Sequence, residues 1–479
     1  QSTVDGVIPS DKDKYNRYTV STKGSHTYKK LTLSSSVNFS LENTSSVPSG
    51  QGTSLYRSLY EIANDISIVD HKDYVNNPFN TLDGYFTPYG VNPYYILDND
   101  AATQKKFKLF GKFQIDYAIR DNLKMTYRFG GDFETSTINA HKGVLAFSPG
   151  SPNFGSDQET PGNYYERRIN RTQMSHDLTF EYNQDLTDDL GFNAVAGLNV
   201  NDRDTNSLRG SINSIDVPGF YNLANSLSSA EASHTHSHRR LVGAYAALDF
   251  DYKNFLYLGL SGRNDWSSTL PQENNSFAYG GATLSFLLSD FLRQQDVNTG
   301  VFNYTKLRAA YGSTGSDAPP YVVYDRYVPG NATHPGYNNI DNLTFPLGGV
   351  NSYTTSNVLG NADIKPELTT EFELGIENYM FDKRVGIEFS YYNRFTKGLI
   401  AALPIDPSSG YTSVTSNLGD VRNKGFEASL NLKPIKSDNF SWDLSLNYSE
   451  NKNKVEKLDV GEVSLGGFGT GAIYAIEGM

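Results

Sequence analysis

Three histidines alternate with hydroxyl residues in the run His234-Thr235-His236-Ser237-His238, which makes it the strongest candidate for metal chemistry in this chain. On an extended strand the three imidazoles would share one face in steps of about 7 Å, so the outer two would lie about 14 Å apart. That separation is too large for one zinc ion bound by three histidines, unless the strand bends. We therefore interpret the run as a solvent-exposed strand end, and no metal site is predicted.

Two pairs of acidic residues, Asp249 with Asp251 and Glu371 with Glu373, have the spacing that places both carboxylates on one face of a strand. Paired carboxylates serve as acid and base in glycoside hydrolysis. However, the sequence contains none of the strings typical of serine hydrolases, zinc proteases or P-loop proteins. We interpret both pairs as a charged wall, and we predict no catalytic residue, no cofactor and no enzyme activity.

The elements that hold these residues are strands, because apolar and polar residues alternate along much of the chain. In one segment Phe107, Leu109, Phe113, Ile115 and Tyr117 alternate with Lys, Gln and Asp. The same pattern recurs in segments 123–134, 190–200, 242–252, 256–260, 282–288, 372–376, 385–391, 426–432 and 442–448. Such alternation places the two residue sets on opposite faces of a sheet. We count about fourteen strands, many of them long enough to cross a bilayer at a tilt.

The connections between these segments are alternately short and long. Short connections are expected at 120–122, 184–189, 253–254 and 381–383. Long loops are predicted near residues 43–105, 138–163, 207–234, 316–366, 396–421 and 454–479. Short turns at one end and long loops at the other are typical of outer-membrane barrels. The sequence thus predicts one all-β domain over 1–479, a transmembrane antiparallel up-and-down β-barrel; a soluble β-sandwich or β-solenoid is the alternative.

The composition of the chain argues against several other classes of protein. The mean hydropathy is −0.49, and no run approaches the roughly 18 apolar residues of a spanning helix. The formal net charge of −12 argues against nucleic acid as a partner. The chain has no cysteine, which excludes disulfides and a cysteine nucleophile.

Several strings resemble the SusC-like (RagA-like) TonB-dependent transporters of the outer membrane. They are, in chain order, Arg263-Asn264-Asp265-Trp266-Ser267-Ser268, Leu307-Arg308-Ala309-Ala310-Tyr311-Gly312-Ser313-Thr314-Gly315, Asn361-Ala362-Asp363-Ile364-Lys365-Pro366-Glu367, Tyr391-Tyr392-Asn393-Arg394-Phe395-Thr396-Lys397-Gly398-Leu399-Ile400 and Asn417-Leu418-Gly419 with Asn423-Lys424-Gly425-Phe426-Glu427. Pro366 stands where the family often has Trp, and Ala362 replaces Pro. These five strings lie in family order over about two-fifths of the chain.

The resemblance implies that this is an interior portion of a 22-stranded barrel in the cell outer membrane. It places an N-terminal plug, a TonB box and further strands outside the sequence. The implied function is active import of oligosaccharide or peptide nutrients. The implied partners are a SusD-like surface lipoprotein that lids the barrel and TonB, which acts through the plug, in addition to the lipid and lipopolysaccharide of the membrane. A passive porin and a siderophore or cobalamin receptor of the same broad class are the alternatives.

Tyrosine is abundant in the long loop 316–366. Ring faces stack on sugars or peptides while amides and charges form hydrogen bonds, and loops on rigid scaffolds commonly carry binding. The predicted substrate-binding residues are the loop residues Tyr321, Tyr324, Asp325, Arg326, Tyr327, Tyr337 and Tyr353, and the lumen residues Arg263 and Asp265. Packing of the loop onto itself or a partner would explain these tyrosines equally well. The tyrosine-rich loop 54–99 is similarly open to a partner-facing role.

Overall fold

The computed structural model describes residues 2–5, 8, 12–47, 54–85, 90–156, 158–329, 331–332, 343–344, 348–468 and 471–479. Strands predominate among them, and the helices are short. None of the helices in these ranges is both long enough and apolar enough to span a bilayer. The chain is therefore an all-β protein, as the alternation predicted.

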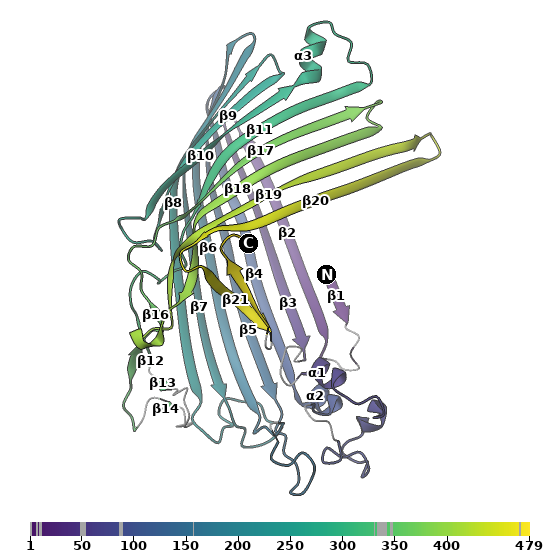
Figure 1. Cartoon of the computed structure of the whole chain (residues 1–479), viewed down its shortest axis with the longest axis vertical. Coiled ribbons are helices and arrows are strands. Elements are labelled where there is room, and N and C mark those ends of the chain that lie inside the picture. The colour runs from purple at the N-terminus through teal and green to yellow at the C-terminus, as the bar shows by residue number, and fades with distance from the viewer. Residues whose placement is uncertain are drawn as a thin grey trace. The chain divides into compact units, whose positions relative to one another are not determined.

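Fourteen long strands form the fold of the described residues (Figure 1). They are β2 (Lys14–Tyr28), β3 (Leu31–Ser46), β4 (Ala101–Arg120), β5 (Leu123–Lys142), β6 (Asn163–Thr187), β7 (Leu190–Ile212), β8 (Glu231–Tyr252), β9 (Leu256–Ser267), β10 (Ser276–Leu287), β11 (Phe302–Ser316), β17 (Glu367–Met380), β18 (Val385–Pro404), β19 (Ser413–Lys436) and β20 (Ser441–Leu458). Their lengths, from 12 residues in β9 to 25 in β6, exceed those of typical soluble strands.

Short elements decorate the connections. The short strands are β1 (Ser2–Asp5), β12 (Tyr327–Pro329), β13 (Asn331–Ala332), β14 (Leu343–Thr344), β15 (Tyr353–Thr355), β16 (Val358–Leu359), β21 (Glu462–Phe468) and β22 (Gly471–Ile476). The helices are α1 (Leu55–Tyr60), η1 (Ile68–Lys72), α2 (Pro93–Asn99), α3 (Leu288–Gln294) and η2 (Pro407–Ser409).

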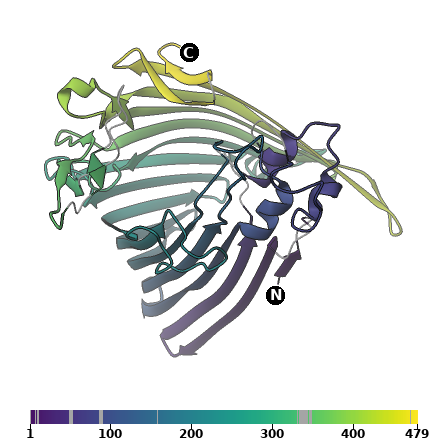
Figure 2. The ribbon, with the colours of Figure 1, turned by 90° about the horizontal axis from the view of Figure 1, so that it is seen from below.

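The strands follow one another in the sheet in the order of the sequence, from β1 to β11 and then β17, β18 and β19 (Figure 2). β20 pairs with β19, and β16 adds a short parallel pairing to β19. The described pairings of the long strands with one another are antiparallel. This up-and-down order confirms the predicted topology.

Tight turns join several strands, as expected. Lys253 and Asn254, between β8 and β9, have φ of 51° and 56°, the two positive values that a type I′ hairpin turn requires. The strands themselves extend farther into the predicted long loops than the alternation indicated. β5 runs to Lys142 and β18 to Pro404, because backbone pairing continues where the side chains no longer alternate between apolar and polar.

One connection departs from the predicted alternation of short and long. The link between β10 and β11 lies at the tight-turn end, yet it contains the helix α3. Phe291 of α3 packs on Phe255 and Phe286, with ring centroids 5.2 and 5.5 Å away. This aromatic contact anchors the helix on the strand ends, and its partner Phe255 lies 36 positions before Phe291, so the sequence alone did not indicate it.

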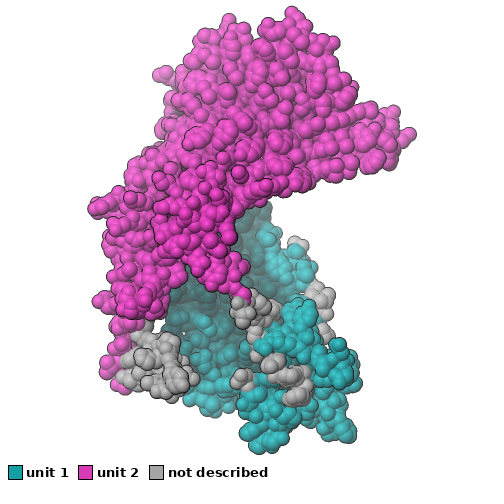
Figure 3. All heavy atoms as spheres, in the orientation of Figure 1, with its two compact units in different colours: residues 1–115, 128–175, 202–238 teal, residues 116–127, 176–201, 239–479 magenta. Residues whose placement is uncertain are grey.

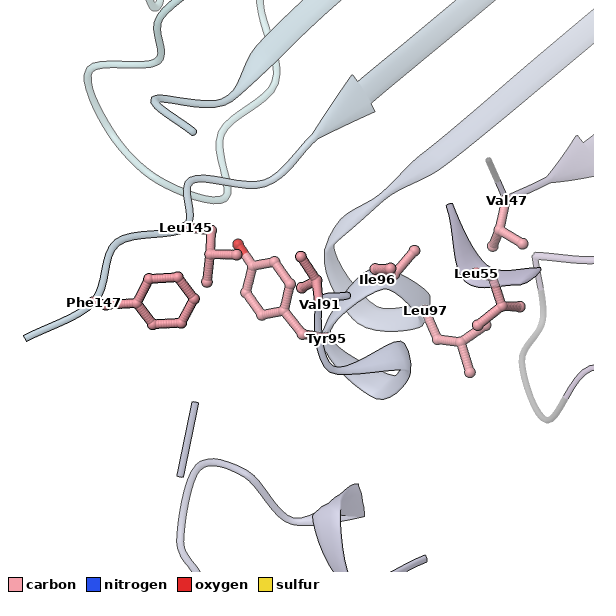
Figure 4. Close-up of a cluster of buried hydrophobic side chains, with 8 residues drawn as sticks. All are labelled: Val47, Leu55, Val91, Tyr95, Ile96, Leu97, Leu145 and Phe147. Carbon is pink, nitrogen blue, oxygen red and sulfur yellow. The ribbon is translucent and has the colours of Figure 1, made fainter. Parts of the chain in front are cut away.

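The described chain forms two compact units (Figure 3). Unit 1 comprises residues 1–115, 128–175 and 202–238, and unit 2 comprises residues 116–127, 176–201 and 239–479. Unit 1 has its own small core of loop residues (Figure 4): Val47, Leu55, Val91, Tyr95, Ile96, Leu97, Leu145 and Phe147. Tyr95 also donates its hydroxyl to the Val144 carbonyl at 2.6 Å. The loop of α1 and α2 is therefore folded against the loop that follows β5.

In unit 2 the apolar residues of neighbouring strands lie opposite one another. Leu248 pairs with Leu260, Leu284 with Leu258 and Ala309, Leu374 with Ala309 and Tyr391, and Phe426 with Tyr391. Their side chains are nonetheless substantially exposed, Leu284 at 45% and Leu374 at 45%. We call this surface of β8–β11 and β17–β20 the apolar face. The alternate residues of the same strands form the polar face.

Candidate functional site

Arg263 and Asp265 lie on the polar face of β9, two residues apart. Arg263 donates from Nε to Oδ1 of Asp265 at 2.8 Å, and the hydroxyl of Tyr279 on β10 donates to Oδ2 at 2.6 Å. Asp265 is only 2% exposed. The two predicted residues are thus brought together, and the carboxylate of Asp265 is engaged in holding Arg263 and Tyr279. Arg263 is the member of the pair with exposed side-chain surface, at 24%.

A glycine on the neighbouring strand makes room for this pair. Gly243 of β8 lies opposite Asp265, and a Cβ at that position would collide with Arg263 Nη2 and Asp265 Oδ1. Tyr245, two residues on, places its ring 5.6 Å from the Arg263 guanidinium carbon and donates its hydroxyl to Asp177 at 2.8 Å. The arginine therefore lies between a carboxylate and an aromatic face, a position that fixes its direction.

Asp317 is the first residue of the long loop after β11. Its carboxylate accepts several hydrogen bonds that the sequence did not reveal. It accepts from Arg239 Nε at 2.8 Å and Nη2 at 2.5 Å. The hydroxyls of Ser267 and Thr269 also donate to its Oδ2, at 2.5 and 3.1 Å. Its side chain is 6% exposed. One end of the loop is therefore tied to β8 and to the connection that follows β9.

The same loop carries its own apolar core. Ile364 is fully buried, and it clusters with Leu270, Ala318 and Val323. These residues come from both ends of the loop and from the connection between β9 and β10. Burying a side chain such as Ile364 contributes about 1.5–3 kcal/mol. The described parts of the loop are thus packed onto unit 2.

Two asparagines of the family-like strings fasten the other end of the loop. Asn417 accepts from the Lys365 backbone at 2.9 Å and donates to the carbonyls of Lys365 and Gly398, both at 2.8 Å. Asn361 donates to the Thr415 carbonyl at 3.0 Å. Gly398 adopts a φ of 68°, which glycine alone adopts readily. These string residues therefore have a structural role, joining the loop to the β18–β19 hairpin.

Four tyrosines in the described part of this loop have exposed side chains. Tyr324, Tyr327 and Tyr353 are 72%, 79% and 67% exposed, and Tyr321 is 43% exposed. In the β12–β15 ribbon Tyr327 pairs with Thr355 and Tyr353 with Pro329, so both tyrosines lie on one ribbon face. Tyr411, from the loop between β18 and β19, joins them: its pKa is raised by partial desolvation and then by the nearby Asp325 carboxylate and Tyr327. We call Tyr321, Tyr324, Tyr327, Tyr353 and Tyr411 the tyrosine cluster.

The two charged residues beside the tyrosine cluster, Asp325 and Arg326, have different contacts within the loop. The Asp325 carboxylate accepts from the Gly360 backbone at 2.8 Å, so it holds the loop. Arg326 places its guanidinium carbon 5.9 Å from the ring centre of Tyr321. Tyr337, also predicted as a binding residue, lies outside the described residues. Tyr411 was missed because its loop is separated from 321–327 by two strands.

The histidine run lies on β8, and each histidine faces its own partner on β7. His234 Nε2 contacts Asn206 at 3.2 Å, His236 contacts Asp204 at 2.6 Å and His238 contacts Asp202 at 3.0 Å. The three imidazoles thus belong to three separate cross-strand pairs. Within the described residues, no three His, Cys, Asp or Glu side chains converge as metal ligands.

The aromatic residues of the unit 1 loop divide into buried and exposed sets. Tyr85 and Tyr95 are 2% and 7% exposed, and burial raises the pKa of Tyr85 to about 12. Tyr60 and Phe79 are 88% and 87% exposed. The loop therefore has a packed side and an exposed aromatic side, which its composition alone did not separate.

An antiparallel up-and-down sheet with one apolar and one polar face is the architecture of outer-membrane β-barrels. Comparison with known proteins identifies the kind of barrel: the model of the TonB dependent receptor-like, beta-barrel family matches residues 10–468. The chain belongs to this family, whose members are outer-membrane receptors.

Named relatives agree with this assignment. TonB-dependent receptor P26 of Formosa agariphila is 29% identical over 359 residues, which cover 74% of this chain and 34% of the relative. TonB-dependent receptor SusC of Bacteroides thetaiotaomicron is 24% identical over 379 residues, covering 77% and 35%. A structure of the RagAB peptide transporter aligns with a TM-score of 0.75 and 16% identity over 97% of this chain and 49% of that one. The chain thus spans about a third of these relatives and half of that structure. The predicted SusC-like resemblance is confirmed.

Proposed function

We propose that this chain is part of a TonB-dependent importer of oligosaccharides or peptides in the outer membrane, and that it works with a SusD-like surface lipoprotein. The family assignment and the relatives named SusC and RagAB support the class of transporter. The tyrosine cluster is the single observation that supports capture of such cargo by this chain. Exposed, tethered aromatic rings offer stacking surfaces at low entropic cost, because the described parts of the loop that carry them are packed onto unit 2.

Arg263 fits a second step of the same pathway. Its guanidinium is held by Asp265 and Tyr245 on the polar face, and its exposed edge can donate to a hydroxyl, a carbonyl or a carboxylate. Cargo that leaves the loops would meet this polar face next. In this reading the chain makes and breaks no covalent bond, and it holds no cofactor.

The test is a binding screen of the full-length transporter, purified with and without its co-expressed surface lipoprotein, against pools of glycans and peptides. We expect one pool to bind, and uptake of that cargo by cells to require an intact TonB. Binding that is confined to iron chelates or corrinoids would refute the proposal in favour of a siderophore or cobalamin receptor. Uptake that persists without TonB would instead indicate a passive pore.

A further inference from the structure

Four cations gather on the apolar face of unit 2, next to its last aromatic residues. On β19 and β20, Arg422 lies opposite Lys454 and Lys424 lies opposite Lys452. The next positions along the same face are Phe426 and Glu450, and then Ala428 and Tyr448. We call Arg422, Lys424, Lys452 and Lys454 the basic cluster.

Acidic neighbours satisfy only half of this charge. Arg422 pairs with Glu456 at 2.9 Å, and Lys452 pairs with Glu450 at 3.2 Å. Arg422 also donates to Asn393 at 3.1 Å and lies 4.7 Å from the ring centre of Phe395. Lys424 and Lys454 form no ion pair with any residue that the structure describes. Like charges directly opposite each other destabilise a strand pair, so an external anion would relieve this arrangement.

The position of the cluster indicates where that anion comes from. Along β19 the apolar face runs from Phe426 to Ile435, which a register shift brings opposite Trp442 of β20. Ten residues at about 3.3 Å each, tilted by about 40°, span about 23–25 Å, the height of the lipid-facing band of a barrel. Phe426 and Tyr448, with ring centroids 5.6 Å apart, then mark the interface, where aromatic residues gather. The basic cluster lies just beyond them, toward the long loops, at the level of the lipid headgroups.

We propose that the basic cluster binds the phosphate groups of a lipid in the outer leaflet of the membrane. Lys424 and Lys454 supply the unneutralised charges, and Arg422 supplies a planar guanidinium whose direction Glu456 and Phe395 fix. Phe426 and Tyr448 flank the site on the side of the acyl chains. This inference rests on the proposed outer-membrane location, but it does not depend on which cargo is imported.

The experiment measures lipid retention by the full-length transporter in detergent, using native mass spectrometry and titration with bisphosphorylated lipid A. We expect the double variant Lys424→Gln/Lys454→Gln to bind this lipid about 25-fold more weakly, since each surface cation is worth about fivefold. The wild-type protein should prefer the bisphosphorylated lipid to its dephosphorylated form. The variant Lys424→Arg/Lys454→Arg should retain binding, because it keeps the charge.

Lys433 and Lys436 provide a matched control, because they lie on β19 at the other end of the apolar face, on either side of Ile435. Lys433→Gln/Lys436→Gln should bind lipid as the wild type does. Equal lipid binding by the wild type and the Lys424→Gln/Lys454→Gln variant would overturn the proposal. Displacement of the lipid by an equimolar amount of inorganic phosphate would refute the assignment of a lipid as the ligand. Cargo binding is measured on the same samples, so that loss of cargo recognition is distinguished from loss of the lipid site.

Discussion

Arg239 donates to both carboxylate oxygens of Asp317, from Nε at 2.8 Å and from Nη2 at 2.5 Å. The two residues are 78 positions apart in the sequence, and the Asp317 side chain is almost fully buried. A bidentate pair of this kind combines direction with strength. It therefore defines where the loop that carries the tyrosine cluster begins.

Replacement of Asp317 should loosen that loop. Asp317→Ala leaves Arg239 and the hydroxyls of Ser267 and Thr269 without their shared acceptor, at a cost of about 3 kcal/mol of local stability. Hydrogen exchange of residues 317–329 should rise accordingly. A double-mutant cycle with Arg239→Gln should show coupling of more than 1 kcal/mol. Additive effects would mean that the pair does not hold the loop.

A methyl group at Gly243 should displace Arg263. The Cβ of Gly243→Ala would collide with the guanidinium and with Asp265, so we expect a loss of about 1–3 kcal/mol or a displaced arginine. Gly262→Ala is the matched control on β9, because a Cβ there meets no atom within 4 Å. Thermal unfolding in detergent compares the two variants. Equal midpoints, together with unchanged cargo binding, would argue against the close approach of β8 and β9 at this point.

The tyrosine cluster should contribute directly to cargo affinity. Tyr327→Ala and Tyr353→Ala each remove an exposed ring from one face of the β12–β15 ribbon, and each should weaken binding about tenfold, or 1.4 kcal/mol. Tyr327→Phe should bind nearly as the wild type does if stacking dominates. Calorimetry with the cargo found in the screen measures these changes. Tyr474→Ala, an exposed tyrosine on β22, should have no effect.

Acidic pH should strengthen the loop packing of unit 1. Burial raises the pKa of Asp100 above its usual value of 3.8, although the Gly143 amide donates to it at 3.0 Å. A carboxyl whose folded-state pKa is raised contributes stability that is fully present below the unfolded pKa and is lost as pH rises through the folded pKa. Hydrogen exchange around Gly143, corrected for its intrinsic rate, should therefore slow between pH 7 and pH 4. Asp100→Asn should abolish this dependence; if the variant keeps it, another group is responsible.

The sheet could be predicted because the alternation of apolar and polar residues indicates that its two faces lie in different environments. Leu248 and Leu260 were placed on one face from sequence, and the structure pairs them. β2 was not singled out, since its run of Ser, Thr and Gly residues gives both faces a similar polarity. Helix α3 was also missed, because it depends on Phe255 and Phe286 from neighbouring strands.

The candidate site was predictable only where its partners are close in sequence. Arg263 and Asp265 share a face by their spacing of two, and the structure joins them. Asp317, Asn361 and Asn417 each form a hydrogen bond with a residue about 50 positions away, and a single sequence does not reveal such contacts. Asp325 was selected for its charge, whereas its carboxylate receives the Gly360 amide.

The anchoring of the loop at Asp317 and at Asn361 with Asn417 has an evolutionary consequence. A loop held by hydrogen bonds at both of its ends can change its exposed middle residues without disturbing the strands, because those hydrogen bonds do not involve the exposed residues. If this loop captures cargo, as proposed above, its exposed residues are the positions at which cargo preference can change while Asp317, Asn361 and Asn417 keep the loop in place.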